Sequence, residues 1–343
     1  MEIKSYNNFW QRIHKSAKEN GFPLRVMWEL TYRCNFKCRH CYVPKSYKKK
    51  SRQELNTQEV FYILDQLADL GCFYLGFTGG EPFLREDIFD ILWYAKKKGF
   101  QIIIYTNGSL IDKAKAEELK QLNPNKVDIT IPAISKKAFE HITGVKRCRD
   151  KVFKAIGLLH KNGIKLGFKS CLLKVNENEI KEIQDFAASL GALHRLDNRL
   201  SPRLDGDREP YRYRGGLNEK SVAGNTYQVT RSRSCEIGQD YEKTKHEPRH
   251  ACRQAGTTNH EPLFKCGVGV SQAAINPFGE LKMCLMIDYP KYKILNKQVS
   301  GIRYQVSGNT SHVSGSTYQV AGNTSHVTRR TSGRWPEMCV GET

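Results

Sequence analysis

The segment that decides the fold is residues 31–42, which read Thr-Tyr-Arg-Cys-Asn-Phe-Lys-Cys-Arg-His-Cys-Tyr. Its cysteines, Cys34, Cys38 and Cys41, have the spacing C-x3-C-x2-C. Three thiolates in one short loop can bind three irons of a four-iron cluster, which leaves the remaining iron open to another molecule. Clusters that only transfer electrons are normally held by four cysteines. The loop therefore indicates a cluster that binds a ligand and reacts with it.

Other kinds of site contain part of this pattern. Cys38 and Cys41 alone could form half of a zinc site or a dithiol redox pair. A zinc site would need a second pair of Cys or His ligands, and no clear pair follows nearby. A haem attachment site needs His directly after the second Cys, where this chain has Tyr42. The loop alone leaves the zinc and redox alternatives open.

A second motif follows the apolar, aromatic-rich run at residues 72–77, which is typical of a buried strand. It is Gly79-Gly80-Glu81-Pro82. The glycines allow the backbone to approach a ligand closely, Glu81 offers a carboxylate to an ammonium group, and Pro82 stiffens the turn. Taken alone, the motif could be an ordinary glycine turn after a strand. Its position one strand–helix unit after the cysteine loop makes the combination specific.

Together the two motifs resemble the radical SAM enzyme superfamily, over about residues 20–205 and a further patch at 262–292. The resemblance implies a [4Fe–4S] cluster on Cys34, Cys38 and Cys41, with S-adenosylmethionine bound to the open iron. It also implies cofactor-binding roles for residues near the cluster. These are Gly79, Gly80, Glu81 and Pro82 at the methionine amino group, His40 at the adenine, Asn107 after the third strand, and Thr130 at the ribose.

The resemblance implies a reaction as well. An external one-electron donor, similar to flavodoxin or ferredoxin, reduces the cluster, and S-adenosylmethionine is cleaved to methionine and a 5′-deoxyadenosyl radical. The radical then removes hydrogen from a substrate. The protein's part is to bind, orient and exclude water, while the radical chemistry belongs to the cofactors.

Hydrophobic periodicity predicts alternating strands and helices, and hence a parallel sheet with right-handed crossovers. The fold class is α/β, a partial (β/α)6 TIM-like barrel with a small, interrupted C-terminal β-hairpin extension. The ligand-binding motifs follow strand ends, as expected for parallel α/β folds. The predicted strands are 24–30, 72–77, 101–106, 126–131, 165–175 and 192–197, and the predicted helices are 56–70, 86–98, 112–122, 147–162 and 178–190.

The C-terminal patch predicts a β-hairpin with its turn at Asn276–Gly279. Cys266 and Cys284 lie on either side of this turn. The block resembles the start of a SPASM or twitch extension, which implies an auxiliary iron–sulfur cluster on Cys266 and Cys284. Two cysteines on a hairpin without metal remain the alternative, because a full extension carries several more cysteines.

Two stretches have the composition of low-complexity sequence. Both contain the phrases Gly-Asn-Thr and Tyr-Gln-Val, and they carry few large aliphatic residues. We interpret them as a repetitive element that entered the reading frame twice. The predicted organisation is a leader helix (1–22), the radical SAM core (23–213), a low-complexity insertion (214–261), a SPASM/twitch-like segment (262–295) and a repetitive, disordered tail (296–343).

Composition limits the function classes. The chain has 343 residues and a formal net charge of +20, which would suit a polyanionic partner. We do not expect nucleic acid to bind, because the lysines fall on helix faces and in solvated runs and the aromatic residues do not alternate with them. No apolar run is long enough to cross a membrane, and the polar N-terminus lacks the apolar core of a signal peptide. We therefore expect a cytoplasmic protein without membrane contact.

The expected function is modification of a peptide or protein, or of a peptide-derived or tetrapyrrole cofactor. One alternative is a non-catalytic or decayed protein that binds an iron–sulfur cluster or zinc. A second alternative is a radical SAM enzyme that modifies RNA, which the basic charge favours weakly.

Overall fold

The computed structural model describes residues 11–13, 15–17, 22–48, 53–216, 272–285 and 287–293. Residues 11–13 and 15–17 are helical, where the sequence predicts a leader helix. The strands are β1 (Arg25–Thr31), β2 (Tyr74–Gly79), β3 (Gln101–Thr106), β4 (Lys126–Thr130), β5 (Leu166–Cys171), β6 (Leu193–Asp197), β7 (Gln272–Ile275), β8 (Glu280–Cys284) and β9 (Ile287–Lys293). The longer helices are α2 (Thr57–Asp69), α3 (Ile88–Lys97), α4 (Lys113–Leu122), α5 (Lys136–Thr143), α6 (Cys148–Lys161) and α7 (Ile180–Ser189).

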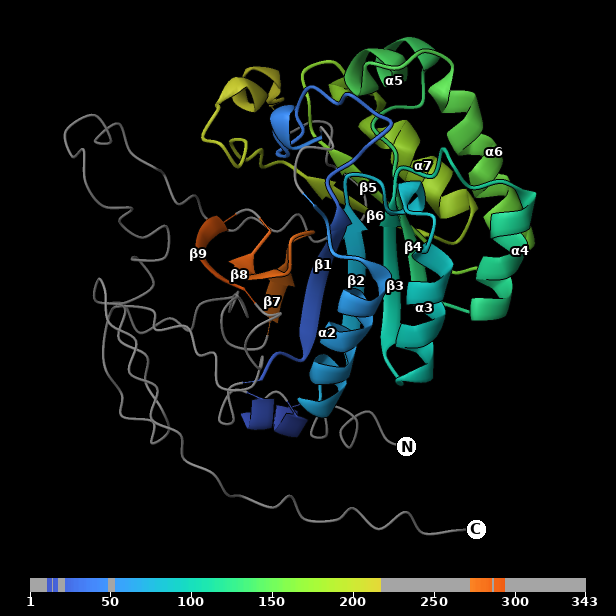
Figure 1. The fold of residues 1–343 in the computed structure, drawn as a ribbon. Helices are drawn as coiled ribbons and strands as arrows, with labels where there is room; N and C mark the ends of the chain where they lie inside the picture. Colours follow the sequence, from blue (N-terminus) through green and yellow to red (C-terminus); the bar gives the residue numbers. More distant parts are fainter. Residues whose placement is uncertain are drawn as a thin grey trace, which may run out of the picture.

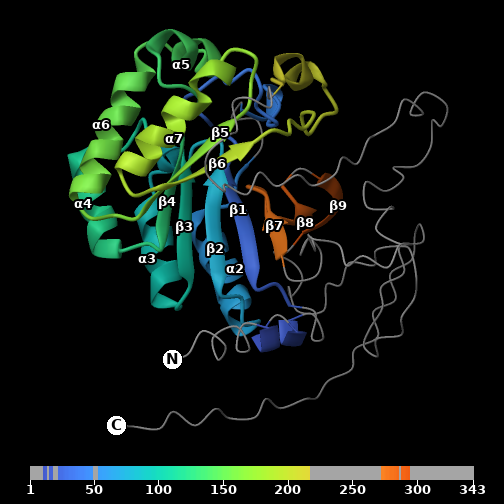
Figure 2. The same ribbon diagram turned by 180° about the vertical axis from the view of Figure 1, so that it is seen from behind.

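The described strands form one curved sheet in the order β6-β5-β4-β3-β2-β1-β7-β8-β9. Strands β1 to β6 pair in parallel. The helices that connect them cover the outer face of the sheet (Figures 1 and 2). This arrangement confirms the predicted partial (β/α)6 barrel. Among the described residues, no helix combines the length and the apolar character that a membrane crossing requires.

The C-terminal hairpin extends the barrel sheet itself. Strand β7 runs parallel to β1, with Ala273 beside Val26, and β8 and β9 follow in antiparallel order. The predicted turn at Asn276–Gly279 is present. The side chain of Asn276 accepts hydrogen bonds from the N–H groups of Phe278 and Glu280. Local sequence predicts such a turn, but pairing with a strand some 250 residues earlier depends on the tertiary fold.

Helix α2 shows how local sequence sets an element. Asn56 accepts a hydrogen bond from the N–H of Glu59 at 3.0 Å, and Glu59 accepts one from the N–H of Asn56 at 2.8 Å. This reciprocal pair satisfies two N–H groups that lack partners within the helix. Val60, Ile63, Leu64 and Leu67 then repeat at helical spacing and are buried against the sheet. The helix lies within one residue of its predicted ends.

The segment before α6 differs from the prediction, which placed one helix at 147–162. The structure has a separate helix α5, whose N-cap Ser135 accepts from the N–H of Ala138 and whose C-cap is the left-handed Gly144. Eight residues are too few for a convincing hydrophobic period, so only the capping residues indicate this helix. Strand β5 also ends at Cys171 and not at 175. Asn176 accepts from the N–H of Leu173 and donates to the carbonyl of Cys171, which turns the chain away from the sheet.

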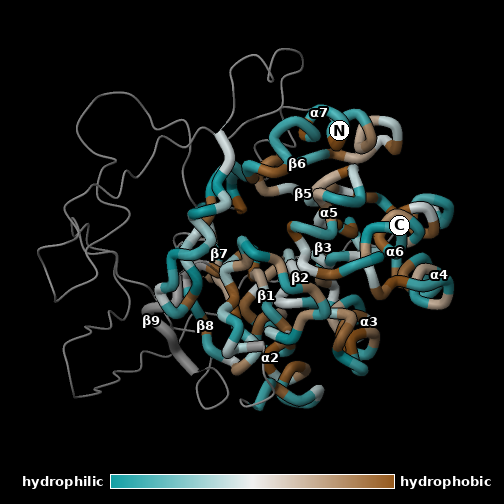
Figure 3. The backbone as a smooth tube through the Cα atoms, turned by 90° about the horizontal axis from the view of Figure 1, so that it is seen from above, coloured by the Kyte–Doolittle hydropathy of each residue, from teal (hydrophilic) through white to brown (hydrophobic). Residues whose placement is uncertain are grey.

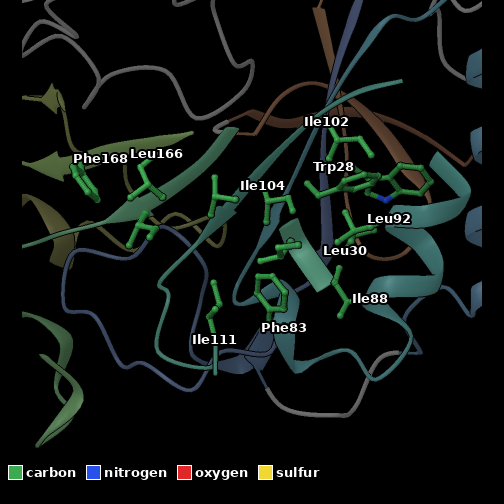
Figure 4. Close-up of a cluster of buried hydrophobic side chains, with 14 of the residues drawn as sticks. Trp28, Leu30, Phe83, Ile88, Leu92, Ile102, Ile104, Ile111, Leu166 and Phe168 are labelled. Carbon is green, nitrogen blue, oxygen red and sulfur yellow. The ribbon is translucent and has the colours of Figure 1, made fainter. Parts of the chain in front are cut away.

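The core lies between the sheet and the helices. Figure 4 shows Trp28, Leu30, Ile102, Ile104 and Phe168 among the side chains that fill it. Each large apolar side chain buried there stabilises the fold by about 1.5–3 kcal/mol. Residues alternate between faces along a strand, so their neighbours in sequence point to the inner face of the curved sheet. The view along the strands in Figure 3 shows the helices outside this curve.

Candidate active site

The three cysteines lie in the loop directly after β1, at the carboxyl ends of the parallel strands. Cys34, Cys38 and Cys41 are all half-buried. The N–H of Phe36 donates to Sγ of Cys34 at 3.4 Å. In the part of the chain that the structure describes, no three His, Cys, Asp or Glu side chains converge on one point to hold a metal ion.

Backbone hydrogen bonds to two other segments of the chain stabilise the cysteine loop. The N–H groups of Lys37 and Arg39 donate to the carbonyls of Thr143 and Ile142, at 2.8 and 3.2 Å. These carbonyls are at the end of α5, where an uncapped helix would leave them without partners. On the other side, the N–H of Leu204 donates to the carbonyl of Tyr42 at 2.9 Å. The loop conformation therefore depends on two segments that sequence patterns did not connect with it.

Glu54 stabilises the start of the cysteine loop through hydrogen bonds and an ion pair. Its Oε1 accepts from the hydroxyl of Thr31 at 2.7 Å and from the N–H of Tyr32 at 3.1 Å. Its Oε2 accepts from Nε of Arg33 at 3.2 Å. Glu54 was not predicted, because it lies between two expected elements and belongs to no motif.

The glycine turn lies directly against the cysteine loop. The N–H of Gly80 donates to the carbonyl of Thr31 at 2.7 Å, and the N–H of Glu81 donates to the carbonyl of Arg33 at 2.8 Å. A Cβ atom at Gly79 would lie 2.2 Å from the carbonyl oxygen of Thr31, and one at Gly80 would lie 2.1 Å from that of Arg33. Gly79 also has a positive φ of 138°. Only glycine permits this close approach of the two motifs.

Glu81 is fully buried, and its carboxylate accepts hydrogen bonds from other groups of the protein. Oε1 accepts from the Thr106 hydroxyl at 2.7 Å and from the N–H of Phe83 at 3.2 Å. Oε2 accepts from the N–H of Asn107 at 2.7 Å. Burial raises the pKa of Glu81 to about 7, although these three hydrogen bonds oppose the rise. Contact of this carboxylate with an ammonium group of a ligand stays a prediction.

Asn107 follows β3 and is turned toward the cysteine loop. Its Nδ2 donates to Oδ1 of Asn35 at 2.8 Å, and its Oδ1 accepts from the hydroxyl of Ser109 at 2.6 Å. Nδ2 of Asn35 donates to the same Ser109 hydroxyl at 2.8 Å. These side chains connect the loop to the end of β3. Asn35 and Ser109 were not predicted, although Asn35 lies within the cysteine motif.

The other predicted site residues occupy different positions around the same edge of the sheet. Pro82 is buried and begins a short 3-10 helix at Pro82–Leu84, which Glu81 caps. Thr130 is exposed at the end of β4. His40 faces a cavity of about 130 Å³. This cavity is lined by Arg39, His40, His141, Ile142, Leu173, Lys174, Val175, Arg212 and Tyr213.

A buried acidic side chain supports the loop from the inner face of the sheet. Oε1 of Glu29 accepts from the hydroxyl of Tyr42 at 2.5 Å, and Oε2 accepts from the hydroxyl of Tyr32 at 3.0 Å. Lys282 of β8 lies 3.2 Å from the same Oε2. Burial raises the pKa of Glu29, opposed by Lys282, and burial also raises the pKa of Tyr42. A carboxylate within the apolar run 24–30 was the signal that could have marked this residue.

Of the two expected auxiliary ligands, Cys284 lies within the described residues and Cys266 lies outside them. Cys284 is the last residue of β8, where it pairs with Ile287. Cys266 lies outside the described residues, as do most of the proposed insertion and the whole proposed tail. Residues 214–216 of that insertion do pack on the core, since the N–H of Gly215 donates to the carbonyl of Leu172 at 3.2 Å.

Residues 28–187 match the sequence profile of the Radical SAM superfamily. This segment is a radical SAM domain. Curated relatives include Fe-coproporphyrin III synthase of Methanosarcina barkeri, 34% identical over 160 residues, which are 47% of this chain and 40% of that protein. PqqA peptide cyclase of Granulibacter bethesdensis is 28% identical over 170 residues, 50% of this chain and 45% of that protein. The chain thus matches less than half the length of these two relatives.

Solved structures share the fold of this chain. SuiB of Streptococcus suis is 18% identical, with a TM-score of 0.61 over 89% of this chain and 72% of that chain. SuiB bound to S-adenosylmethionine is 17% identical, with a TM-score of 0.60 over 87% of this chain and 71% of that chain. At this identity the similarity supports the fold. The radical SAM superfamily uses a [4Fe–4S] cluster and S-adenosylmethionine.

Proposed function

We propose that the chain is a radical SAM enzyme that binds a [4Fe–4S] cluster on Cys34, Cys38 and Cys41 and reductively cleaves S-adenosylmethionine. The observation that carries this proposal is the pair of backbone hydrogen bonds that joins the cysteine loop to the glycine turn, from Gly80 to Thr31 and from Glu81 to Arg33. They hold the two binding motifs in one rigid unit. Such preorganisation lowers the entropic cost of aligning a ligand with the group that reacts with it.

The donor set fits the proposed cluster. The cysteine loop supplies three half-buried cysteines, and three thiolate ligands leave one iron available for a non-protein ligand. When bound and reduced, the cluster supplies the electron that cleaves the sulfonium bond. An external donor, similar to flavodoxin or ferredoxin, would provide that electron.

The surrounding residues would bind and orient S-adenosylmethionine. The glycine turn would bind the methionine part through its backbone groups. The missing Cβ atoms of Gly79 and Gly80 leave room for the carbonyl oxygens of Thr31 and Arg33, and so bring the turn against the cysteine loop. The cavity beside His40 is smaller than the roughly 300–1,000 Å³ of pockets that enclose a whole small-molecule ligand. It therefore suits one part of the ligand, and we assign it to the adenine. Thr130 would contact the ribose, and Asn107 would hold the mouth of the site in shape through Asn35.

For the substrate, we propose a peptide, a protein or a cofactor precursor. One curated relative is named PqqA peptide cyclase, and a structure of SuiB is bound to its precursor peptide SuiA. Fe-coproporphyrin III synthase and AdoMet-dependent heme synthase are relatives with names from tetrapyrrole synthesis. Because each alignment covers only part of these proteins, we propose the substrate class without choosing one member.

The test is release of 5′-deoxyadenosine. The purified chain is reconstituted anaerobically with iron and sulfide, reduced with dithionite and incubated with S-adenosylmethionine. We expect 5′-deoxyadenosine and methionine in equal amounts from wild type and none from Cys38→Ala. Iron–sulfur absorbance without cleavage would instead identify a non-catalytic cluster protein, and zinc without iron would overturn the cluster assignment.

A further inference from the structure

The inner face of the sheet carries basic side chains that the proposed function does not use. Lys169 in β5 pairs with Thr130 of β4 on one side and with Arg195 of β6 on the other. Paired residues of neighbouring strands point to the same face. Since Phe168 is buried in the core on the outer face, Lys169 and Arg195 lie on the inner face. Like charges on adjacent strand positions destabilise a sheet, so this pair would be stabilised by an anion.

An aromatic ring holds Lys169 in position without neutralising it. Nζ lies 3.8 Å from the centre of the Tyr105 ring. A ring face attracts an ammonium group but does not use its N–H donors in ordinary hydrogen bonds. Among the described residues, this ammonium has no hydrogen-bond acceptor and no ion-pair partner. The arrangement leaves its donors available to a ligand.

The two nearby acidic groups, Asp128 and Asp197, have hydrogen-bond or ion-pair partners of their own. Asp128 is bound by Lys126, with Nζ 2.9 Å from Oδ1. Asp197 accepts a hydrogen bond from the N–H of Arg199 at 3.1 Å. Burial and then the charge of Arg195 lower the pKa of Lys169 to about 7, although Asp128 and Asp197 oppose this shift. Bringing an oxyanion to this point would restore the charged form of the lysine.

We propose that Lys169 and Arg195 bind an oxyanion of the substrate, a carboxylate or a phosphate, inside the barrel. Lys169 lies two residues before the end of β5, so the anion would be held below the mouth that the cysteine loop borders. The rest of the substrate would extend from this anchor toward the mouth. The proposal rests on the proposed function only in naming the ligand a substrate.

Isothermal titration calorimetry at pH 6 with the purified full-length chain tests this proposal, using glutarate and inorganic phosphate as probes. The variants are Lys169→Met and Arg195→Met. The control is Lys161→Met, which removes an exposed lysine from the last turn of α6. We expect each inner-face variant to weaken anion binding by about tenfold, as for loss of a hydrogen bond between charged groups, and the control to match wild type.

Each outcome is decisive. Binding of glutarate alone identifies a carboxylate site, and binding of phosphate alone identifies a phosphate site. Absence of binding for both anions at millimolar concentrations overturns the proposal, as does an equal loss in Lys161→Met. Far-UV circular dichroism of the variants verifies that they fold. The titration needs neither cluster nor reductant, so its failure is distinguishable from failure of 5′-deoxyadenosine release.

Discussion

Lys282 forms an ion pair with Glu29 across a separation of 253 residues, with both side chains fully buried and Nζ 3.2 Å from Oε2. The same carboxylate binds the hydroxyl of Tyr42, the residue after the last cysteine of the loop. The C-terminal hairpin is therefore connected to the cysteine loop through one buried side chain. Loss of the hairpin would leave this carboxylate buried without its cation.

Replacement of Lys282 by Met tests this connection. We expect the free energy of unfolding to fall by about 3–5 kcal/mol, the cost of leaving a buried charge without its partner. Urea denaturation followed by circular dichroism measures it. The double variant Glu29→Gln, Lys282→Met should recover part of the loss, because the uncompensated charge is gone. A loss in Lys282→Met no larger than in Lys120→Met, on the exposed face of α4, would contradict the role of the pair.

Gly80→Ala tests the contact between the two motifs. The added Cβ would lie 2.1 Å from the carbonyl oxygen of Arg33, so the backbone must move. We expect a loss of about 1–3 kcal/mol in unfolding free energy and loss of S-adenosylmethionine binding by equilibrium dialysis. Gly157→Ala is the matched control, since its Cβ meets nothing within 4 Å inside α6. It should stabilise the chain by about 0.5–1 kcal/mol. Unchanged ligand binding in Gly80→Ala would refute the close approach.

The raised pKa of Glu81 predicts that the stability of the fold depends on pH. The pKa of Glu81 rises from 4.5 to about 7 on folding, so the folded chain binds this proton more tightly than the unfolded chain. The resulting stabilisation is complete below the unfolded pKa and disappears as the pH rises through about 7, by up to about 3 kcal/mol. Urea denaturation of wild type and Glu81→Gln between about pH 4 and 8 measures this difference. We expect the unfolding free energy of wild type to fall relative to that of Glu81→Gln as the pH rises. A difference between the two proteins that does not change with pH would contradict the raised pKa of Glu81.

Cys38→Ala tests the metal assignment. Cys38 is half-buried, so the variant should fold but lose iron content and iron–sulfur absorbance after anaerobic reconstitution. Cys72→Ala is the control. Burial raises the pKa of the Cys72 thiol to about 12, which makes it a poor metal ligand, and iron content should be unchanged. Iron retained by Cys38→Ala, or lost from Cys72→Ala, would show that the cluster lies elsewhere.

Anion binding on the inner face should depend on pH. Because the pKa of Lys169 is lowered to about 7, its ammonium is lost as the pH rises through that value, and affinity for glutarate should fall between about pH 6 and 8. In Lys169→Met the affinity should be flat over this range, which calorimetry can measure. A similar fall in the variant would assign the effect to another group. The charged and titratable groups that face Lys169 are Tyr105, Lys126, Asp128, Cys171, Arg195 and Asp197.

Sequence patterns predicted the elements that depend on local residues. Strand β3 and helix α4 lie at their predicted positions or within one residue of them, since a short apolar run and an N-cap at Asp112 are local signals. Helix α5 was missed because it spans only eight residues. The motif residues Gly79 and Gly80 were identified for a ligand, and the structure adds that they also let β2 approach the cysteine loop.

The supporting residues could not be predicted from the sequence. Glu29, Glu54 and Lys282 belong to no motif, and Lys282 lies 253 residues from its partner Glu29. Their importance comes from burial and hydrogen bonding, which exist only once the sheet has formed. The same holds for Lys169 and Arg195, because only strand register brings them side by side.

The sequence by itself determined that three cysteines and a glycine turn follow successive strands, because residue spacing and hydrophobic period are properties of the chain. The tertiary structure decided how those motifs are held. It joined the loop to the turn by backbone hydrogen bonds, turned the Glu81 carboxylate inward, and paired Glu29 with Lys282. Contacts between distant residues depend on register and burial, and these arise only when the strands assemble into one sheet.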